Sequence, residues 1–236
     1  RCYWNDEGWL RMANGSNTPD LVAEAPGLPA CAFPEPEEVD HFDEDTLDIN
    51  FNTLREPFDP SWGSLTERPG HLRLYGRYSP TSLFSQSLVA RRLQHFWVQA
   101  ETAVDFDPQD YRQMAGLICV YNEKNFRYLR ISYNDSIGRN VAVISMDRGR
   151  PEISVLDDIP DEGKVFLKAT FYFDKLKLFW SNDGTMWRQV GPTYDAGKLS
   201  DDYCRGFTGT FVGMSVNDMT GQKLHADFDF FRYEEK

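Results

Sequence analysis

Alternation of apolar and polar residues is the main pattern along this chain. Between Phe96 and Phe106, every second residue is apolar or small, and most of the residues between them are polar. A strand with one buried face and one solvated face has this period of two. The expected buried face consists of Phe96, Val98, Ala100, Thr102, Val104 and Phe106. The segment is therefore predicted to be a half-buried antiparallel strand.

The same alternation recurs elsewhere, with turn residues between the runs. Residues 165–173 alternate, and residues 175–180 follow almost at once, which predicts a hairpin. Further strands are predicted over residues 71–75, 113–121, 128–133, 141–147, 211–216 and 226–233. No stretch of ten or more residues has a helical period. Many short strands without intervening helices predict an all-β fold, a two-sheet antiparallel sandwich of jelly-roll type.

Residues 1–38 differ in character from the rest of the chain. Residues 3–10 have the pattern of a hairpin turn, and residues 25–36 are rich in proline, which is typical of an extended linker. The sandwich is expected to begin at Val39. Two parts are therefore predicted, 1–38 and 39–236, and the beginning at Arg1 has the character of an internal segment rather than of a signal peptide.

Composition narrows the classes of partner. The 236 residues are 41% hydrophobic, enough for one large β domain, and the formal net charge is -12. This charge argues against a nucleic-acid surface or an anionic membrane surface, since phosphates would be repelled. No apolar run approaches the roughly 18 residues that cross a bilayer. The compartment is not decided by the sequence.

No catalytic constellation is visible. Glycoside hydrolysis needs two carboxylates across a cleft, but 37 acidic residues are present and no pair is distinguished from the others. The four histidines stand alone, without a nucleophile elbow or a zinc-protease motif. The four cysteines lack zinc-ligand spacing, and Cys119, inside an apolar run, is expected to be a buried small residue.

Acidic residues near both ends of the predicted sandwich suggest a metal site. Asp40 or Asp43 lies on its first strand and Asp227 or Asp229 on its last, and such strands often pair. Carboxylates and loop carbonyls suit Ca²⁺, which takes six to eight oxygen ligands. A structural calcium ion at Asp40 and Asp227 is therefore one expectation. The alternative is solvated charge at a sheet edge, which discourages aggregation.

One aromatic residue has an unusual setting. Phe207 lies in Gly206-Phe207-Thr208-Gly209, just before a predicted strand. Glycine accepts backbone angles that Phe does not, so flanking glycines can hold an aromatic ring outside the core. Trp62 and Trp97 are further candidates for a sugar-stacking surface, although a role in the core or in an interface is the usual one for such residues. Phe207 is therefore the candidate ligand-binding residue.

Several segments together resemble a known family, the C-terminal sandwich of glycoside hydrolase family 43 β-xylosidases, which is concanavalin A-like. The resemblance covers residues from about 38 to the end, and residues 4–15 with the following prolines are similar to the end of that family's five-bladed propeller and its linker. The segments that carry it are Asp40-His41-Phe42-Asp43, Phe51-Asn52-Thr53-Leu54-Arg55, residues 64–76, Ser87-Leu88-Val89-Ala90-Arg91-Arg92, Met114-Ala115-Gly116-Leu117, Gly206-Phe207-Thr208-Gly209 and Ala226-Asp227-Phe228-Asp229.

The resemblance implies the C-terminal portion of an inverting β-xylosidase that degrades xylo-oligosaccharides. The family's catalytic carboxylates lie in the propeller, upstream of Arg1, so no catalytic residue and no catalytic cofactor are expected in this chain. A sandwich loop of the family inserts a phenylalanine into the active-site mouth, and by position in the motif this residue is Phe207.

The resemblance also implies calcium in some sandwiches and a homo-oligomer, with a propeller in the same or a separate chain. It leaves open whether xylose or arabinose is preferred. Two alternatives are an independent carbohydrate-binding module and, less compatible with the residues, a hydrolase in its own right.

Overall fold

The computed structural model describes residues 1–33 and 37–236. The chain divides into two compact units, Arg1–Pro36 and Glu37–Lys236. The first unit contains a short antiparallel hairpin of β1 (Cys2–Trp4) and β2 (Leu10–Met12). Its turn is closed by the backbone amide of Asn5, which donates to the carbonyl oxygen of Trp9 at 2.9 Å. A hairpin in this region agrees with the sequence prediction.

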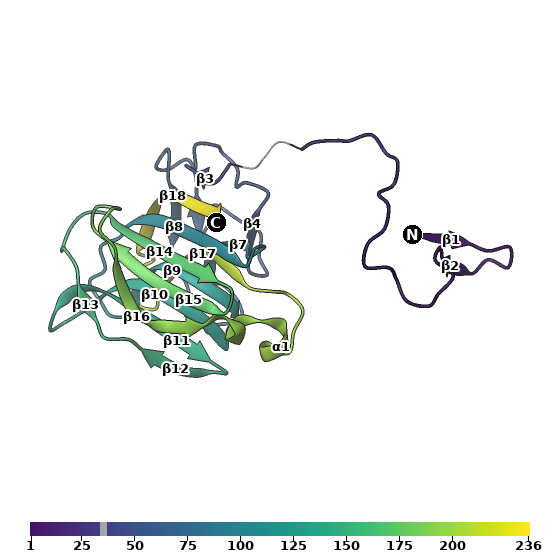
Figure 1. The fold of residues 1–236 in the computed structure, drawn as a ribbon. Helices are drawn as coiled ribbons and strands as arrows, with labels where there is room; N and C mark the ends of the chain where they lie inside the picture. Colours follow the sequence, from purple (N-terminus) through teal and green to yellow (C-terminus); the bar gives the residue numbers. More distant parts are fainter. Residues whose placement is uncertain (34–36) are drawn as a thin grey trace. The chain divides into compact units, whose positions relative to one another are not determined.

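The second unit contains two antiparallel sheets that lie face to face (Figure 1). The first sheet has the order β12-β11-β10-β9-β17-β7-β4, and β13 pairs with β11 beside this path. Its strands are β4 (Phe51–Thr53), β7 (Ser87–Arg92), β9 (Gln113–Asn122), β10 (Asn125–Asn134), β11 (Gly138–Asp147), β12 (Arg150–Ile153), β13 (Asp157–Asp158) and β17 (Phe211–Asp218). The long strands β9, β10 and β11 form a continuous meander.

The second sheet has the order β16-β15-β14-β8-β18-β6-β5, and β3 pairs with β18. Its strands are β3 (Val39–Asp40), β5 (Gly63–Ser64), β6 (Leu72–Tyr75), β8 (Trp97–Asp105), β14 (Val165–Tyr172), β15 (Lys175–Ser181), β16 (Arg188–Asp195) and β18 (His225–Glu235). The predicted two-sheet antiparallel sandwich is thereby confirmed.

The inner faces of the two sheets form the main core. Val98, Ala100 and Val104 of β8 are fully buried, as are Leu129 and Ile131 of β10 in the opposite sheet. Burying a side chain the size of Val or Leu stabilises a fold by about 1.5–3 kcal/mol relative to leaving it in water. This interdigitated layer fixes the register of the strands, because a slip by one residue would turn every one of these side chains toward solvent.

The first sheet also has an apolar outer face. Ile118, Phe126 and Tyr128 are at most 1% exposed, although they point away from the main core. The Tyr128 hydroxyl donates a hydrogen bond of 2.8 Å to the carbonyl oxygen of Ser215 on β17. This bond satisfies the polar end of a ring that is otherwise buried among apolar groups. The outer face of the first sheet is thus a second packed surface, and it is the floor of the site described below.

Strand predictions from alternation agree with the structure for the strongest patterns. The predicted hairpin is formed by β14 and β15, with Ala169 opposite Leu178. One residue of the clearest pattern was misplaced: Phe96 precedes β8 and is 77% exposed, because the strand begins at Trp97. Cys119 is buried, as predicted.

Helical structure in the described residues is limited to one short segment, and no helix there has the length and apolar character needed to cross a bilayer. A 3-10 turn, η1 (Ala196–Leu199), leads directly into α1 (Asp201–Cys204). The Ser200 hydroxyl accepts a hydrogen bond from the Tyr203 amide, and Arg205 ends the helix with a left-handed φ of 58°. Such caps satisfy backbone groups that a one-turn helix cannot pair internally.

Candidate functional site: an exposed aromatic loop beside a groove

The loop that follows α1 presents Phe207 to solvent. The Phe207 side chain is 93% exposed, and Gly209 has a φ of +73°, a conformation that side chains rarely accept. A Cβ atom at Gly206 would lie 2.1 Å from the Tyr121 hydroxyl oxygen. A side chain at position 206 would therefore have to displace the Tyr121 hydroxyl, and glycine at position 209 is favoured by its backbone angle. The exposed position that the sequence suggested for this ring is the one the structure has.

Asp201 ties this loop to the sheet. One of its carboxylate oxygens, Oδ1, accepts a hydrogen bond from the Tyr121 hydroxyl at 2.7 Å and another from the Gly209 amide at 3.0 Å. The hydrogen bond from the Tyr121 hydroxyl is the main reason why the pKa of Asp201 lies below its ordinary value, and the hydrogen bond from the Gly209 amide is the next. Farther along, the Thr210 hydroxyl donates to the Leu199 carbonyl oxygen at 2.7 Å. The loop is therefore fixed at its base while the ring at its tip is free of the core.

A groove of about 510 Å³ begins beside this loop. Its apolar floor is formed on the outer face of the first sheet by Leu88, Ala90, Val120 and Phe211. Around that floor stand the polar side chains of Asn52, Gln86, Tyr121 and Asn122 and the charged side chains of Arg55, Arg92 and Glu123. An apolar floor with a few polar and charged groups at its rim is the usual composition of a small-molecule site.

The groove lacks the chemistry of glycoside hydrolysis. Among the described residues that line it, Glu123 is the only carboxylate. Both stereochemical courses of hydrolysis use two carboxyl groups on either side of the scissile bond. The groove can therefore hold or orient a sugar, but it does not contain an acid and base pair.

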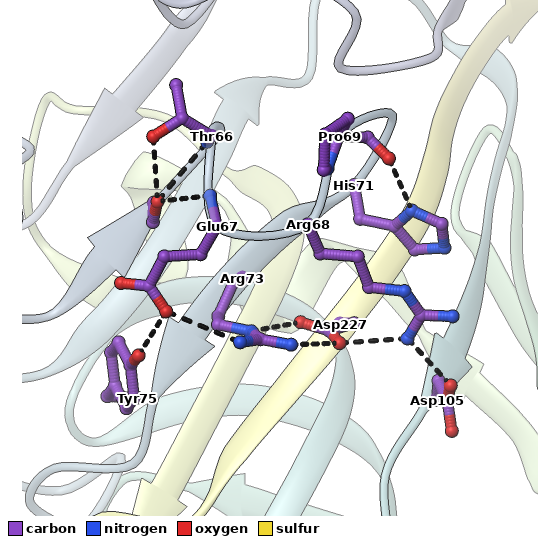
Figure 2. A network of polar contacts seen from close by, with 10 residues as sticks. Thr66, Glu67, Arg68, Pro69, His71, Arg73, Tyr75, Asp105 and Asp227 are labelled. Atoms are coloured by element: carbon purple, nitrogen blue, oxygen red, sulfur yellow. Dashed lines mark hydrogen bonds and ion pairs between the residues drawn. The ribbon is translucent and has the colours of Figure 1, made fainter.

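Asp227, a predicted metal ligand, is paired with two arginines, so its carboxylate oxygens are not free. Figure 2 shows its carboxylate between Arg73, whose Nε and Nη2 donate at 2.7 and 2.8 Å, and Arg68, whose Nη1 donates at 2.8 Å. Arg68 also bonds Asp105 at 2.8 Å. Asp227 is 3% exposed. Burial alone would raise its pKa, but the guanidinium groups outweigh burial and lower the pKa.

Asp40 lies elsewhere on the same strand pair. The pairing of the first and last strands of the sandwich is confirmed, but the register places Asp40 opposite Phe231, four residues beyond Asp227. The Asp40 carboxylate accepts a hydrogen bond of 2.7 Å from the Phe42 amide, and burial raises its pKa. The described residues contain no group of three or more acidic, histidine or cysteine side chains arranged around one point. This donor set does not fit a calcium ion, so calcium stays a prediction without support at this pair.

The two other aromatic candidates have different surroundings. Trp62 is 2% exposed and packs edge-on against Phe58, with the Arg77 guanidinium 4.6 Å from its ring centre. Trp97 is 50% exposed and contacts Tyr172 edge-on. Trp62 is thus a core residue, whereas Trp97 belongs to the surface.

Sequence reasoning missed Asp201 and Tyr121, which hold the Phe207 loop. A signal for Asp201 was available, because Ser200 followed by two aspartates is typical of a helix N-terminus. No signal marked Tyr121, which approaches from a strand 80 residues earlier in the chain.

Comparison with known proteins gives a consistent result. The family model for the β-xylosidase C-terminal concanavalin A-like domain matches residues 39–234. The chain is 41% identical to a β-xylosidase of Bacillus subtilis (strain 168), covering 100% of the chain and 45% of that protein, and 38% identical to a xylan 1,3-β-xylosidase of a Vibrio species, covering 100% and 44%.

Comparison with solved structures indicates the same family. The crystal structure of a xylan β-1,4-xylosidase from Bacillus halodurans C-125 superposes with a TM-score of 0.94 at 41% identity, covering 99% of this chain and 46% of that one. The chain thus spans less than half the length of these relatives and corresponds to their C-terminal part. It belongs to the family of β-xylosidase C-terminal concanavalin A-like domains.

Proposed function

We propose that this chain is the C-terminal portion of a β-xylosidase, in which the sandwich supports a catalytic propeller and Phe207 closes the active site. The observation that carries the proposal is the exposed Phe207 ring on a loop anchored by Asp201, in a chain that aligns over its full length with the C-terminal part of β-xylosidases. The substrate is expected to be a xylo-oligosaccharide, with the propeller supplying the acid and base.

The contribution of Phe207 would be steric and apolar. A rigidly held ring at the mouth of an active site limits which chain ends enter and contacts the face of the sugar. Because correct placement of a substrate lowers the entropic part of the barrier, loss of such a wall slows reaction without touching the groups that transfer protons.

Substitution of Phe207 tests this proposal. In the full-length enzyme that carries this chain, Phe207→Ala is expected to lower kcat/KM for xylobiose by about tenfold, equivalent to ~1.4 kcal/mol of transition-state stabilisation. The melting temperature should not change, because the ring is 93% exposed. Steady-state kinetics and calorimetry supply the two measurements.

Phe173→Ala is the matched control, since this ring is also exposed, at 60%, and also lies in a turn. Its kinetics should equal those of the unmodified enzyme. Equal kcat/KM values for Phe207→Ala and the unmodified enzyme would remove the proposal.

The groove favours a second candidate function, an independent carbohydrate-binding module. Its apolar floor and polar rim suit a neutral sugar without any propeller. Titration of this chain alone with xylo-oligosaccharides distinguishes the two functions. Saturable binding that is weakened by Asn52→Ala would support the module, and absence of heat or spectral change at millimolar sugar would exclude it.

Assembly is part of the same proposal. We expect a homo-oligomer of the complete enzyme, with the propeller attached to this sandwich. Intact mass and light scattering on protein from the natural source would give the length of the polypeptide and the number of subunits.

A further inference from the structure

A second cavity, of about 580 Å³, lies apart from the Phe207 groove and shares no lining residue with it. Strands β11 and β12 form one wall, β16 forms another, and the η1–α1 segment contributes a third. We call it the arginine cleft, because Arg127, Arg148 and Arg150 all line it, together with Lys198. Three carboxylates, Asp147, Glu152 and Asp195, line it as well, so its basic side chains outnumber its acidic ones by one in a chain with a net charge of -12.

The lysine of the arginine cleft is already neutralised. Lys198 Nζ donates to one oxygen of Asp147 at 2.7 Å, and the Tyr203 hydroxyl donates to the other at 2.7 Å. The bond to Asp147 raises the pKa of Lys198 and also that of Tyr203. Each oxygen of Asp147 therefore already accepts a hydrogen bond, and its charge acts on Arg127 only through space.

The three arginines have no such partner. In the part of the chain that the structure describes, none of them lies within 4.0 Å of a carboxylate oxygen. Arg127 is 3% exposed, and its Nη1 donates to the carbonyl oxygens of Phe126 and Met146, but its buried Nε has no hydrogen-bond partner. Because this Nε has no solvent access, Arg127 contributes its positive charge at the back of the cleft rather than a hydrogen bond to a ligand.

The turn between β11 and β12 positions one of these arginines at a conformational cost. Asp147 pairs with Arg150, so the turn consists of Arg148 and Gly149, with φ values of 50° and 77°. Asn, Asp and Gly are the usual residues at the first of these positions, since other side chains are strained there. In this conformation the Arg148 guanidinium lies 4.1 Å from the centre of the Tyr203 ring.

The remaining wall of the arginine cleft suits a polyhydroxylated body. Ser145, Thr193 and Glu152 offer hydroxyl and carboxylate oxygens, which can pair with sugar hydroxyls. The volume lies within the range of small-molecule sites and exceeds what an inorganic anion needs. Guanidinium groups bind carboxylates through two parallel hydrogen bonds, which gives them preference over a neutral sugar.

We propose that the arginine cleft binds a sugar acid, a pyranose that carries a carboxylate, through Arg148 and Arg150 with Arg127 at its back. The proposal goes beyond the function proposed above, because neither Phe207 nor its groove takes part. It adds a second candidate sugar site to the chain, in which the acidic group of the ligand would pair with arginines.

Isothermal titration of this chain with D-glucuronate at low salt tests the proposal, with D-glucose and inorganic phosphate as comparison ligands. We expect saturable binding of glucuronate that Arg150→Gln weakens by about tenfold, as loss of one charge-assisted pair would. Arg188→Gln is the control, because this exposed arginine on β16 lies outside the arginine cleft. It should leave the affinity unchanged.

Four results would overturn the proposal. They are absence of saturable glucuronate binding, equal binding of glucose, binding of phosphate without glucuronate, and an Arg150→Gln variant that binds as well as the unmodified chain. Circular dichroism of each variant establishes that it is folded. Failure of this experiment leaves the kinetic test of Phe207 untouched, so the two proposals are distinguished.

Discussion

At the scale of single residues, Asp227 shows how a side chain can be reassigned by its neighbours. The sequence placed it at a sheet edge, either as a calcium ligand or as solvated charge. Its two arginine partners lie 154 and 159 residues earlier in the chain. No local pattern connects positions so far apart, so the ion-pair network could not be predicted. The exposure of the Phe207 ring could be predicted, because the glycines that flank it are adjacent in the sequence.

Loss of the Asp227 charge should destabilise the sandwich. Asp227→Asn leaves the half-buried guanidinium groups of Arg68 and Arg73 with a weaker acceptor, and breaking such a partly buried pair is expected to cost about 2 kcal/mol. Urea unfolding at pH 7 measures this loss. Asp110→Asn is the comparison, because the Asp110–Arg112 pair lies at the surface and should matter much less. Equal losses in the two variants would contradict the assigned role.

The same residue predicts a pH dependence. The folded-state pKa of Asp227 is lowered from 3.8, so its stabilising effect is complete above that value and is lost as the pH falls through the lower folded-state pKa. The difference in unfolding free energy between the unmodified chain and Asp227→Asn should therefore shrink between pH 5 and pH 2.5. A difference that is constant over this range would show that Asp227 is not held by charge.

At the scale of elements, the strands that could be predicted have either a clean alternation or a long apolar run. Strands β8, β14 and β15 alternate cleanly and were predicted. Strands β9, β10 and β11 are buried on both faces but were predicted as long apolar-rich runs, whereas β7 has six residues, ends in two arginines and was missed. Strand β16 was also missed, since Gly191 with a φ of 71° and the following proline interrupt its register against β15. Two-residue strands such as β5 are too short for any period.

The α1 element has a defined task, which is to hold the base of the Phe207 loop. Asp201→Ala removes the acceptor for the Gly209 amide and for the Tyr121 hydroxyl. We expect amide hydrogen exchange over residues 206–210 to become roughly five- to tenfold faster, as the loss of a hydrogen bond or two implies. Mass spectrometry of exchanged peptides measures this rate.

Asp202→Ala serves as the control for this element. Asp202 is the exposed neighbour of Asp201 in α1, and the structure gives its side chain no hydrogen bond among the described residues. In the Asp202→Ala variant, amide hydrogens of residues 206–210 should exchange as fast as in the unmodified chain. Equal rates in the two variants would mean that Asp201 does not position the loop.

At the scale of the whole molecule, stability is concentrated in one unit. Every buried hydrophobic residue of the core lies between Phe42 and Tyr233, and none lies in Arg1–Pro36 among the described residues. A polypeptide of residues 37–236 should therefore melt within about 2 °C of the complete chain, since it retains the entire apolar core. Differential scanning calorimetry compares the two. A fall of more than about 5 °C would show that the first unit stabilises the sandwich.

The order of strands within the two sheets has a consequence for biosynthesis. Strand β17 lies between β9 and β7, and β18 lies between β8 and β6, so in each sheet a strand that is synthesised late occupies a central place. Until residues 211–235 have left the ribosome, both sheets consist of two separated halves with open edges. Such edges attract other chains, and non-local pairings form slowly. A nascent chain of this sandwich would therefore depend on chaperones until its last two strands emerge.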